Sequence, residues 1–230
     1  MPANRGRSRR PAASCLIRCA ECGVGRRAFT GQHPCRSRSL PLDDVRPLIL
    51  TLGLDAATHA RLHALRTRHF PPERNLVPTH LTLFHALPGA AHADIDRTLH
   101  ALVACTPPIA VAFPALRFLG RGVAVEADAP ALTRLREALA GRWADRLGAQ
   151  DRQRFRAHVT IQNKVSPAQA RALHASLGAS WRRIDGVGAA LLLWRYLGGP
   201  WEPLGRYAFQ GEGEGEGEGE GEARERARAR

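Results

Sequence analysis

Two stretches, HLTL at residues 80–83 and HVTI at residues 158–161, decide how this chain is expected to fold. Both read histidine, aliphatic, threonine, aliphatic. On a β-strand, successive side chains point to opposite faces, so each histidine shares a face with the threonine two residues later. The aliphatic residues then enter a core from the other face. The sequence therefore predicts two strands that each present a histidine–threonine pair.

Histidine paired with threonine suits phosphoryl chemistry. Cleaving a phosphodiester requires a base that activates the attacking oxygen and an acid that protonates the leaving oxygen, and histidine can do either near neutral pH. A threonine hydroxyl can donate a hydrogen bond to a non-bridging phosphate oxygen, where negative charge lies in the transition state. Two facing copies would bracket one phosphate, and this chemistry requires no metal ion or cofactor. The candidate catalytic residues are His80, Thr82, His158 and Thr160.

A single copy of the motif would be weak evidence, because half-buried strand histidines often bond only to the backbone. The duplication is stronger evidence. Two matches among the ten histidines should arise by chance on the order of once in a thousand such chains. We therefore rest the functional interpretation on the pair of motifs.

The two motifs resemble those of the 2H phosphoesterase superfamily, in particular its bacterial 2′-5′ RNA ligase-like and RNA 2′,3′-cyclic phosphodiesterase branch. The approach to the second motif, FRA at residues 155–157, is also similar to that family, where proline often stands in place of Ala157. The resemblance spans residues 46–210. It implies an α/β (α+β) fold with two small sheets, pseudo-twofold symmetry and a central cleft. It also implies that His158 is the general base and His80 the general acid.

Two further residues are candidates for substrate binding because they share strand parity with the motifs. Arg156 would lie on the face of His158 and could reach a phosphate, although a solvated arginine in an arginine-rich stretch is the alternative. Phe84 continues the parity of the first motif and could stack on a base, although packing in the rim or core is more common. The aromatic residues of the expected last hairpin, Trp194, Tyr196 and Trp201, are interpreted as core or sheet-face residues, with base stacking as the alternative.

Strand-like and helical patterns alternate along residues 45–210, which predicts a single α/β body. Asp55 is placed to cap a helix. Ser166 and Pro167 open another helix in the favoured order of cap and then proline. The predicted strands are residues 48–54, 80–87, 109–113, 123–127, 158–162, 188–196 and 206–209, and the predicted helices are 55–68, 94–104, 130–147 and one beginning at 166.

Both ends of the chain differ from this body. Residues 1–44 are rich in arginine, serine, proline and glycine and show no apolar period, so we expect a disordered extension. Residues 211–222 repeat Gly-Glu six times before an arginine-rich end, which predicts a second disordered tail over residues 211–230. These ends contribute +6 and −3 to the formal net charge of +13, so the body carries +10. Such a basic surface attracts RNA or nucleotides, unless it reflects only a compositional preference for arginine.

Possible metal ligands elsewhere in the sequence are weak candidates, and the motifs of several other function classes are missing from the sequence. The four cysteines of the extension, Cys15, Cys19, Cys22 and Cys35, could hold zinc or an iron–sulfur cluster, but nothing around them predicts a fold. His59 and His63 have metal-ligand spacing without an acidic partner, so an exposed helix face is the simpler interpretation. The chain has no Walker loop, dinucleotide turn or nucleophile elbow, and no apolar run long enough to span a membrane.

The sequence thus predicts a metal-independent enzyme that opens 2′,3′-cyclic phosphates of RNA ends or nucleotides, together with reversible 2′-5′ RNA ligase activity. The alternative is a non-catalytic RNA-binding module with the same fold. We expect a monomer without a cofactor. We also expect a cytoplasmic location, because the body holds only Cys105 and cannot depend on an internal disulfide.

Overall fold

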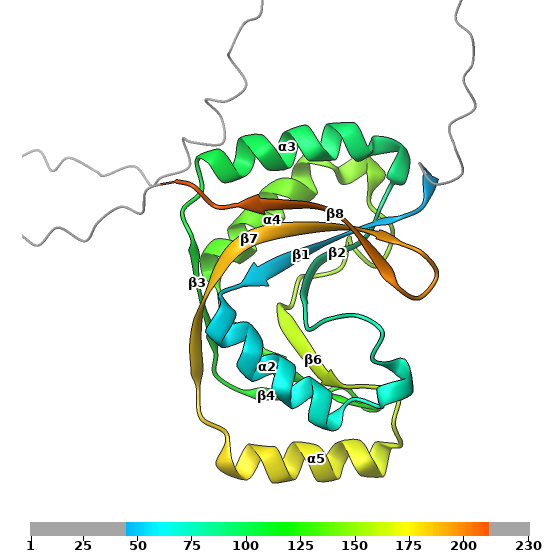
Figure 1. Cartoon of the computed structure of the whole chain (residues 1–230), viewed down its shortest axis with the longest axis vertical. Helices are drawn as coiled ribbons and strands as arrows, with labels where there is room; N and C mark the ends of the chain where they lie inside the picture. The colour runs from blue at the N-terminus through cyan, green and yellow to red at the C-terminus, as the bar shows by residue number, and fades with distance from the viewer. Residues whose placement is uncertain (1–44, 212–230) are drawn as a thin grey trace, which may run out of the picture.

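The computed structural model describes residues 45–211, in which four long helices pack on one curled antiparallel sheet (Figure 1). This arrangement confirms the predicted α+β class. The predictions for the extension at 1–44 and the tail from 212 onward lie outside the described residues. The strands are β1 (Leu48–Leu54), β2 (Leu81–Leu87), β3 (Ile109–Phe113), β4 (Leu116–Phe118), β5 (Val123–Glu126), β6 (His158–Gln162), β7 (Ile184–Tyr196) and β8 (Trp201–Ala208). The long helices are α2 (Ala56–His69), α3 (His92–Ala104), α4 (Pro130–Arg142) and α5 (Pro167–Ser180).

The sheet consists of two halves that meet at the motif strands. Its strand order is β3-β7-β1-β2-β6-β5-β4, and β8 pairs with β7 outside this path. We call β8, β3, β7, β1 and β2 the first sheet half, and β6, β5 and β4 the second sheet half. Only one residue pair, Leu81 with Val159, joins the halves in register. The two small sheets expected from the resemblance are therefore continuous at a single point, next to both motifs.

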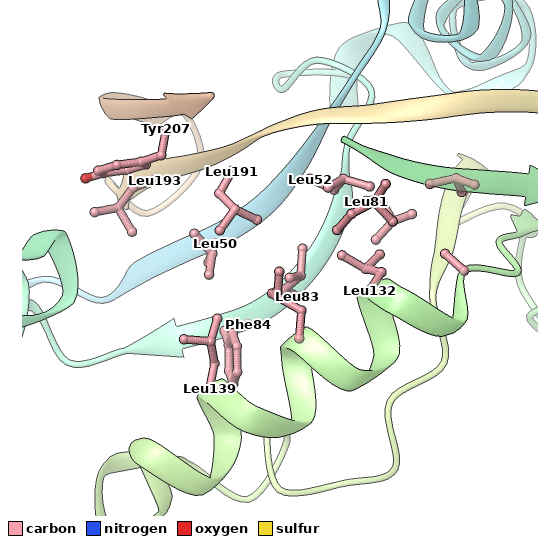
Figure 2. Close-up of a cluster of buried hydrophobic side chains, with 14 of the residues drawn as sticks. Leu50, Leu52, Leu81, Leu83, Phe84, Leu132, Leu139, Leu191, Leu193 and Tyr207 are labelled. Atoms are coloured by element: carbon pink, nitrogen blue, oxygen red, sulfur yellow. The ribbon is translucent and has the colours of Figure 1, made fainter. Parts of the chain in front are cut away.

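Helices α2 and α4 each pack against the motif strand that lies in the other half of the chain. Helix α2 precedes the first motif in sequence, yet it packs against β6 in the second sheet half. Helix α4 precedes the second motif, yet Leu132 and Leu139 project from it toward Leu83 and Phe84 on β2 (Figure 2). The buried Arg66 guanidinium of α2 donates from Nη1 to the Thr160 carbonyl oxygen at 2.7 Å. Each half of the chain thus supports the motif strand of the other half.

The core forms on the face of the sheet that the helices cover, where the strand residues are apolar. Leu81 and Val159, which alternate with the motif residues, have no exposed surface, as strand parity predicts. Leu50, Leu191 and Leu193 extend the same core into β1 and β7 (Figure 2). Burying one leucine contributes about 1.5–3 kcal/mol relative to leaving it exposed. This core therefore holds β2 firmly between β1 and α4.

Helices α2 and α5 begin at the capping residues that the sequence predicts. Asp55 caps α2 by accepting a hydrogen bond from the Thr58 backbone N–H at 2.9 Å. Ser166 and Gln169 form a capping box at the start of α5, whose first residue is Pro167. Helix α2 also lies close to β7 at Gly186, where a Cβ would collide with the Thr58 side chain. Glycine at this position allows the helix to approach the strand.

Other boundaries differ from the predictions. Strand β7 begins at Ile184 rather than residue 188, because its first residues pair with β3 and need no apolar run. Strand β4 was not predicted, since three residues carry too little pattern. Helix α4 ends at Arg142 and a short 3-10 turn follows. Across residues 45–211, no helix is both long enough and apolar enough to cross a membrane.

Candidate functional site

The four predicted catalytic residues line one small cavity between β2 and β6. Its volume is about 140 Å³. All four side chains are half-buried, so a ligand in the cavity would lose much of its contact with water. The lining residues are Ile49, His80, Thr82, His85, His158, Thr160 and Trp201.

Strand register explains the convergence. Leu81 pairs with Val159 in antiparallel orientation. Continuing this register by one residue in each direction places His80 opposite Thr160 and Thr82 opposite His158. Directly opposite residues on one face have Cβ atoms about 4.5–5.5 Å apart. The duplicated motif therefore forms a compact set of two imidazoles and two hydroxyls related by a local twofold.

Both motif histidines are fixed in the same tautomer. Nδ1 of His80 lies 2.7 Å from the Pro78 carbonyl oxygen, and Nδ1 of His158 lies 2.8 Å from the Arg156 carbonyl oxygen. A carbonyl only accepts hydrogen bonds, so Nδ1 carries the hydrogen in each ring. Nε2, on the other side of each ring, is then the nitrogen that can accept a proton from a ligand.

Burial makes both rings weak bases, to different degrees. Desolvation lowers the pKa of His80 to about 4, the hydrogen bond to Pro78 opposes this, and positive charge on Arg66 lowers the pKa further. Desolvation also lowers the pKa of His158, where the hydrogen bond to Arg156 opposes the shift. Both imidazoles are consequently neutral at pH 7 while the cavity holds no anion. A bound phosphate would raise both pKa values.

Aromatic side chains, which we call the aromatic cover, lie on one side of the cavity. The centroid of the Trp201 ring lies 4.5 Å from that of His80, in a tilted arrangement. Trp201 in turn packs against Trp194, whose indole N–H donates to Thr51 at 2.9 Å. Of the three aromatic residues considered from the sequence, Trp201 is thus the one that lines the cavity.

Phe84 does not contact the cavity, so its assignment to base stacking is wrong. It has no exposed surface and its ring packs edge-on against Trp143, with ring centroids 5.4 Å apart. The cause is an irregularity in the pairing of β1 and β2 between Thr82 and Phe84, which turns two consecutive residues inward. His85 then occupies the cavity-facing position. The adjacent apolar residues Leu83 and Phe84 break the strand alternation, and this was the available signal.

Arg156 also lies outside the central cavity. Its exposed side chain lines a groove of about 340 Å³ on the flank of His158, together with Arg117 and Arg154. Glu126 lies in the same groove and stands opposite His158 in the register of β5 and β6. The groove is therefore a basic surface that begins beside the second motif. Substrate binding by Arg156 stays a prediction.

His59 and His63, the possible metal ligands that lie in the described residues, form no metal site there. Within residues 45–211, no group of three or more histidine, cysteine, aspartate or glutamate side chains could hold a metal ion. The four-cysteine cluster of the extension lies outside the described residues. His59 and His63 stack on one another along α2, with ring centroids 5.6 Å apart.

Comparison with known proteins agrees with the fold. A model of the 2′-5′ RNA ligase superfamily matches residues 54–200, well over half of the chain. The structure is similar to that of TT0787 of Thermus thermophilus, with a TM-score of 0.52, 20% identity, and coverage of 73% of this chain and 100% of that chain. It is also similar to E. coli LigT complexed with 3′-AMP, with a TM-score of 0.48, 20% identity, and coverage of 72% and 98%. No curated protein matches the sequence.

Proposed function

Because this chain belongs to the 2′-5′ RNA ligase superfamily, a branch of the 2H phosphoesterases, we propose that it opens 2′,3′-cyclic phosphates of RNA ends or nucleotides. The reaction needs no metal ion, and 2′-5′ ligation is the same ring opening with a ribose 5′-hydroxyl in place of water as the nucleophile. The observation that carries the proposal is the convergence of His80, Thr82, His158 and Thr160 in one cavity. An RNA-binding surface alone would not require two buried imidazoles on opposite strands.

The four groups can complete the reaction between them. One imidazole Nε2 takes the proton of a water molecule as its oxygen attacks phosphorus. The other gives its proton to the ribose oxygen as the P–O bond of the ring breaks, leaving a phosphomonoester. Thr82 and Thr160 donate hydrogen bonds to the non-bridging oxygens, where charge builds up in the transition state. The histidines finish with their protonation states exchanged.

The order of the two roles is a separate part of the proposal. The resemblance implies His158 as base and His80 as acid. In the unliganded protein, the larger fall in pKa belongs to His80, and this favours His80 as the unprotonated base. A base must be unprotonated and an acid protonated when the reaction starts. If His80 is the base, its pKa sets the acidic limb of the pH profile of kcat/KM. If His80 is the acid, its pKa sets the alkaline limb.

The test is turnover of a nucleoside 2′,3′-cyclic phosphate in the presence of EDTA. We expect wild-type protein to open the ring, and we expect His80→Ala and His158→Ala each to lose about 10²–10⁴-fold in kcat. His100→Ala is the matched control, because His100 is an exposed histidine on α3. RNA binding without turnover in the wild type would instead support the non-catalytic module.

The basic character of the body supports RNA or a nucleotide as the substrate. Residues 45–210 carry most of the formal net charge of +13, and three arginines gather in the groove beside His158. An extended RNA would place further phosphates along this groove. We expect the reaction to take place in the cytoplasm on a monomer, and the mass in solution at working concentration tests the monomeric state.

A further inference from the structure

A third histidine faces the cavity beside the four motif residues. His85 lines the cavity, and 46% of its side chain is exposed. Positive charge on His85 lowers the pKa of both His80 and His158, so the three rings lie within electrostatic reach of one another. Neither HxT motif contains His85, and the proposed reaction assigns it no role.

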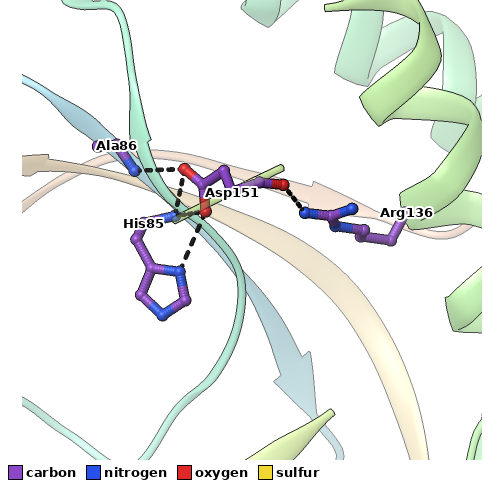
Figure 3. Close-up of polar contacts among 4 residues, drawn as sticks. All are labelled: His85, Ala86, Arg136 and Asp151. Carbon is purple, nitrogen blue, oxygen red and sulfur yellow. Dashed lines mark hydrogen bonds and ion pairs between the residues drawn. The ribbon is translucent and has the colours of Figure 1, made fainter. Parts of the chain in front are cut away.

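A buried carboxylate holds this ring. Nδ1 of His85 lies 3.1 Å from Oδ1 of Asp151 (Figure 3). The same carboxylate accepts hydrogen bonds from the backbone N–H groups of His85 at 2.8 Å and Ala86 at 3.0 Å. The Arg136 guanidinium donates to the Asp151 carbonyl oxygen, which fixes the backbone that carries the carboxylate. Only 2% of the Asp151 side chain is exposed.

Asp151 is charged in this position. Burial raises its pKa, but hydrogen bonds from the His85 ring and from the backbone of His85 and Ala86 outweigh burial, and the net pKa is lowered. The ionised carboxylate accepts the hydrogen on Nδ1 of His85. His80 and His158 differ in this respect, because their Nδ1 atoms face neutral carbonyl groups.

The geometry leaves Nε2 of His85 for a ligand. Nδ1 faces Asp151, so Nε2 lies on the opposite side of the ring, away from the carboxylate (Figure 3). Anchoring the loop around Asp151 to β2 would need only the two backbone N–H groups. That structural role accounts for the carboxylate, but it gives no reason for a half-exposed imidazole at the cavity.

We propose that His85 is a third substrate-binding residue, whose Nε2 forms a hydrogen bond with a non-bridging oxygen of the phosphate while Asp151 holds the ring at Nδ1. The inference rests on the proposed function, since it assigns a further contact to the same phosphate. Asp151 acts through His85 and is a positioning residue. The site would thereby gain a third ring that contacts the phosphate, which the duplicated motifs do not supply.

The experiment separates binding from chemistry. Kinetics with a nucleoside 2′,3′-cyclic phosphate and calorimetry with inorganic phosphate are measured for wild type, His85→Ala and His85→Gln. We expect His85→Ala to raise KM and the phosphate Kd about tenfold, as loss of a charge-assisted hydrogen bond predicts, with a smaller change in kcat. His85→Gln retains a neutral N–H donor and should recover part of the affinity.

The fold should survive His85→Ala, because the Asp151 carboxylate still accepts the two backbone N–H groups. Asp151→Asn should raise KM in the same direction, and its unfolding midpoint is measured alongside. His100→Ala is again the matched control, because His100 forms an exposed pair with Asp96 on α3, 3.8 Å from Nε2 to Oδ1.

Unchanged KM and unchanged phosphate Kd in a folded His85→Ala variant would overturn the inference, as would a wild type that binds no phosphate. Failure of the proposed function looks different. A wild type that binds phosphate but leaves the cyclic phosphate intact refutes the enzyme. The phosphate Kd of His85→Ala still reports on His85 in that case.

Discussion

The two motif strands carry the same pattern of side chains in unequal surroundings. On β2, Trp201 covers the His80 ring, and Arg66 contributes positive charge. Beside β6, Glu126 of β5 lies opposite His158 in the strand register, and a groove lined by three arginines and two acidic residues opens there. Duplication therefore supplies matched groups, whereas the neighbouring elements make one imidazole differ from the other. Such unequal surroundings favour one protonation order of the two imidazoles over the other.

After the two histidines, the largest loss of activity should come from the threonines, where the two halves are expected to act alike. Thr82→Val and Thr160→Val each remove one hydroxyl with little change in shape, and each should lower kcat about 10²–10³-fold. Single-turnover rates of ring opening measure this loss. Thr67→Val, at an exposed position of α2, is the control. A loss confined to one threonine would show that only one half contacts the non-bridging oxygens.

The next effect concerns the free energy of unfolding, whose pH dependence should come more from His80 than from His158. The folded-state pKa of His80, about 4, lies below its ordinary value of 6.5. As pH falls below 6.5 the unfolded chain takes up the proton first, so the folded state loses stability between about pH 6.5 and pH 4. His80 alone should account for about 2 kcal/mol between pH 7.5 and pH 5. Urea unfolding at both pH values measures this loss.

His80→Gln should reduce that pH dependence of unfolding. His158→Gln, the matched variant in the other half, should reduce it less, since the larger fall in pKa belongs to His80. Equal changes in the two variants would contradict the unequal burial of the rings.

A third effect tests the aromatic cover. Trp201→Ala admits water to the His80 ring, so its pKa should rise toward 6.5. The limb of the kcat/KM profile that reports His80 should then move to higher pH. Movement of the acidic limb identifies His80 as the base, and movement of the alkaline limb identifies it as the acid. Trp201→Phe keeps a ring over His80 and should leave both limbs in place.

The smallest effect should come from the groove. Arg156→Gln removes one exposed positive charge beside His158. We expect a several-fold rise in KM for an RNA ending in a cyclic phosphate, with a weaker dependence of binding on salt. A mononucleotide substrate, which has no further phosphates, is the control and should change less. Equal changes for both substrates would place Arg156 at the reacting phosphate itself.

Strand parity and helix caps made much of this molecule predictable. The motif histidines and threonines converge because alternation along a strand is a local property, and Leu81 and Val159 enter the core for the same reason. Asp55 and Ser166 mark helix starts through hydrogen bonds to residues only three positions away. Each of these features depends on a few neighbouring residues.

The features that escaped prediction depend on contacts between distant segments. Phe84 turns into the core and His85 faces the cavity because of how β1 pairs with β2. The partner of His85, Asp151, lies 66 positions away along the chain. Trp201 reaches His80 because β8 folds back along β7. No short window of sequence contains both members of these pairs.

The exchange of α2 and α4 between the sheet halves has a consequence for how the protein can be divided. A polypeptide ending between β2 and α4 would carry α2 without β6, and β2 without α4. Neither fragment could shield its own motif strand from water. Co-expressed as a split protein, the two fragments should assemble by mutual complementation and regain the whole site together, whereas either one expressed alone should remain unfolded.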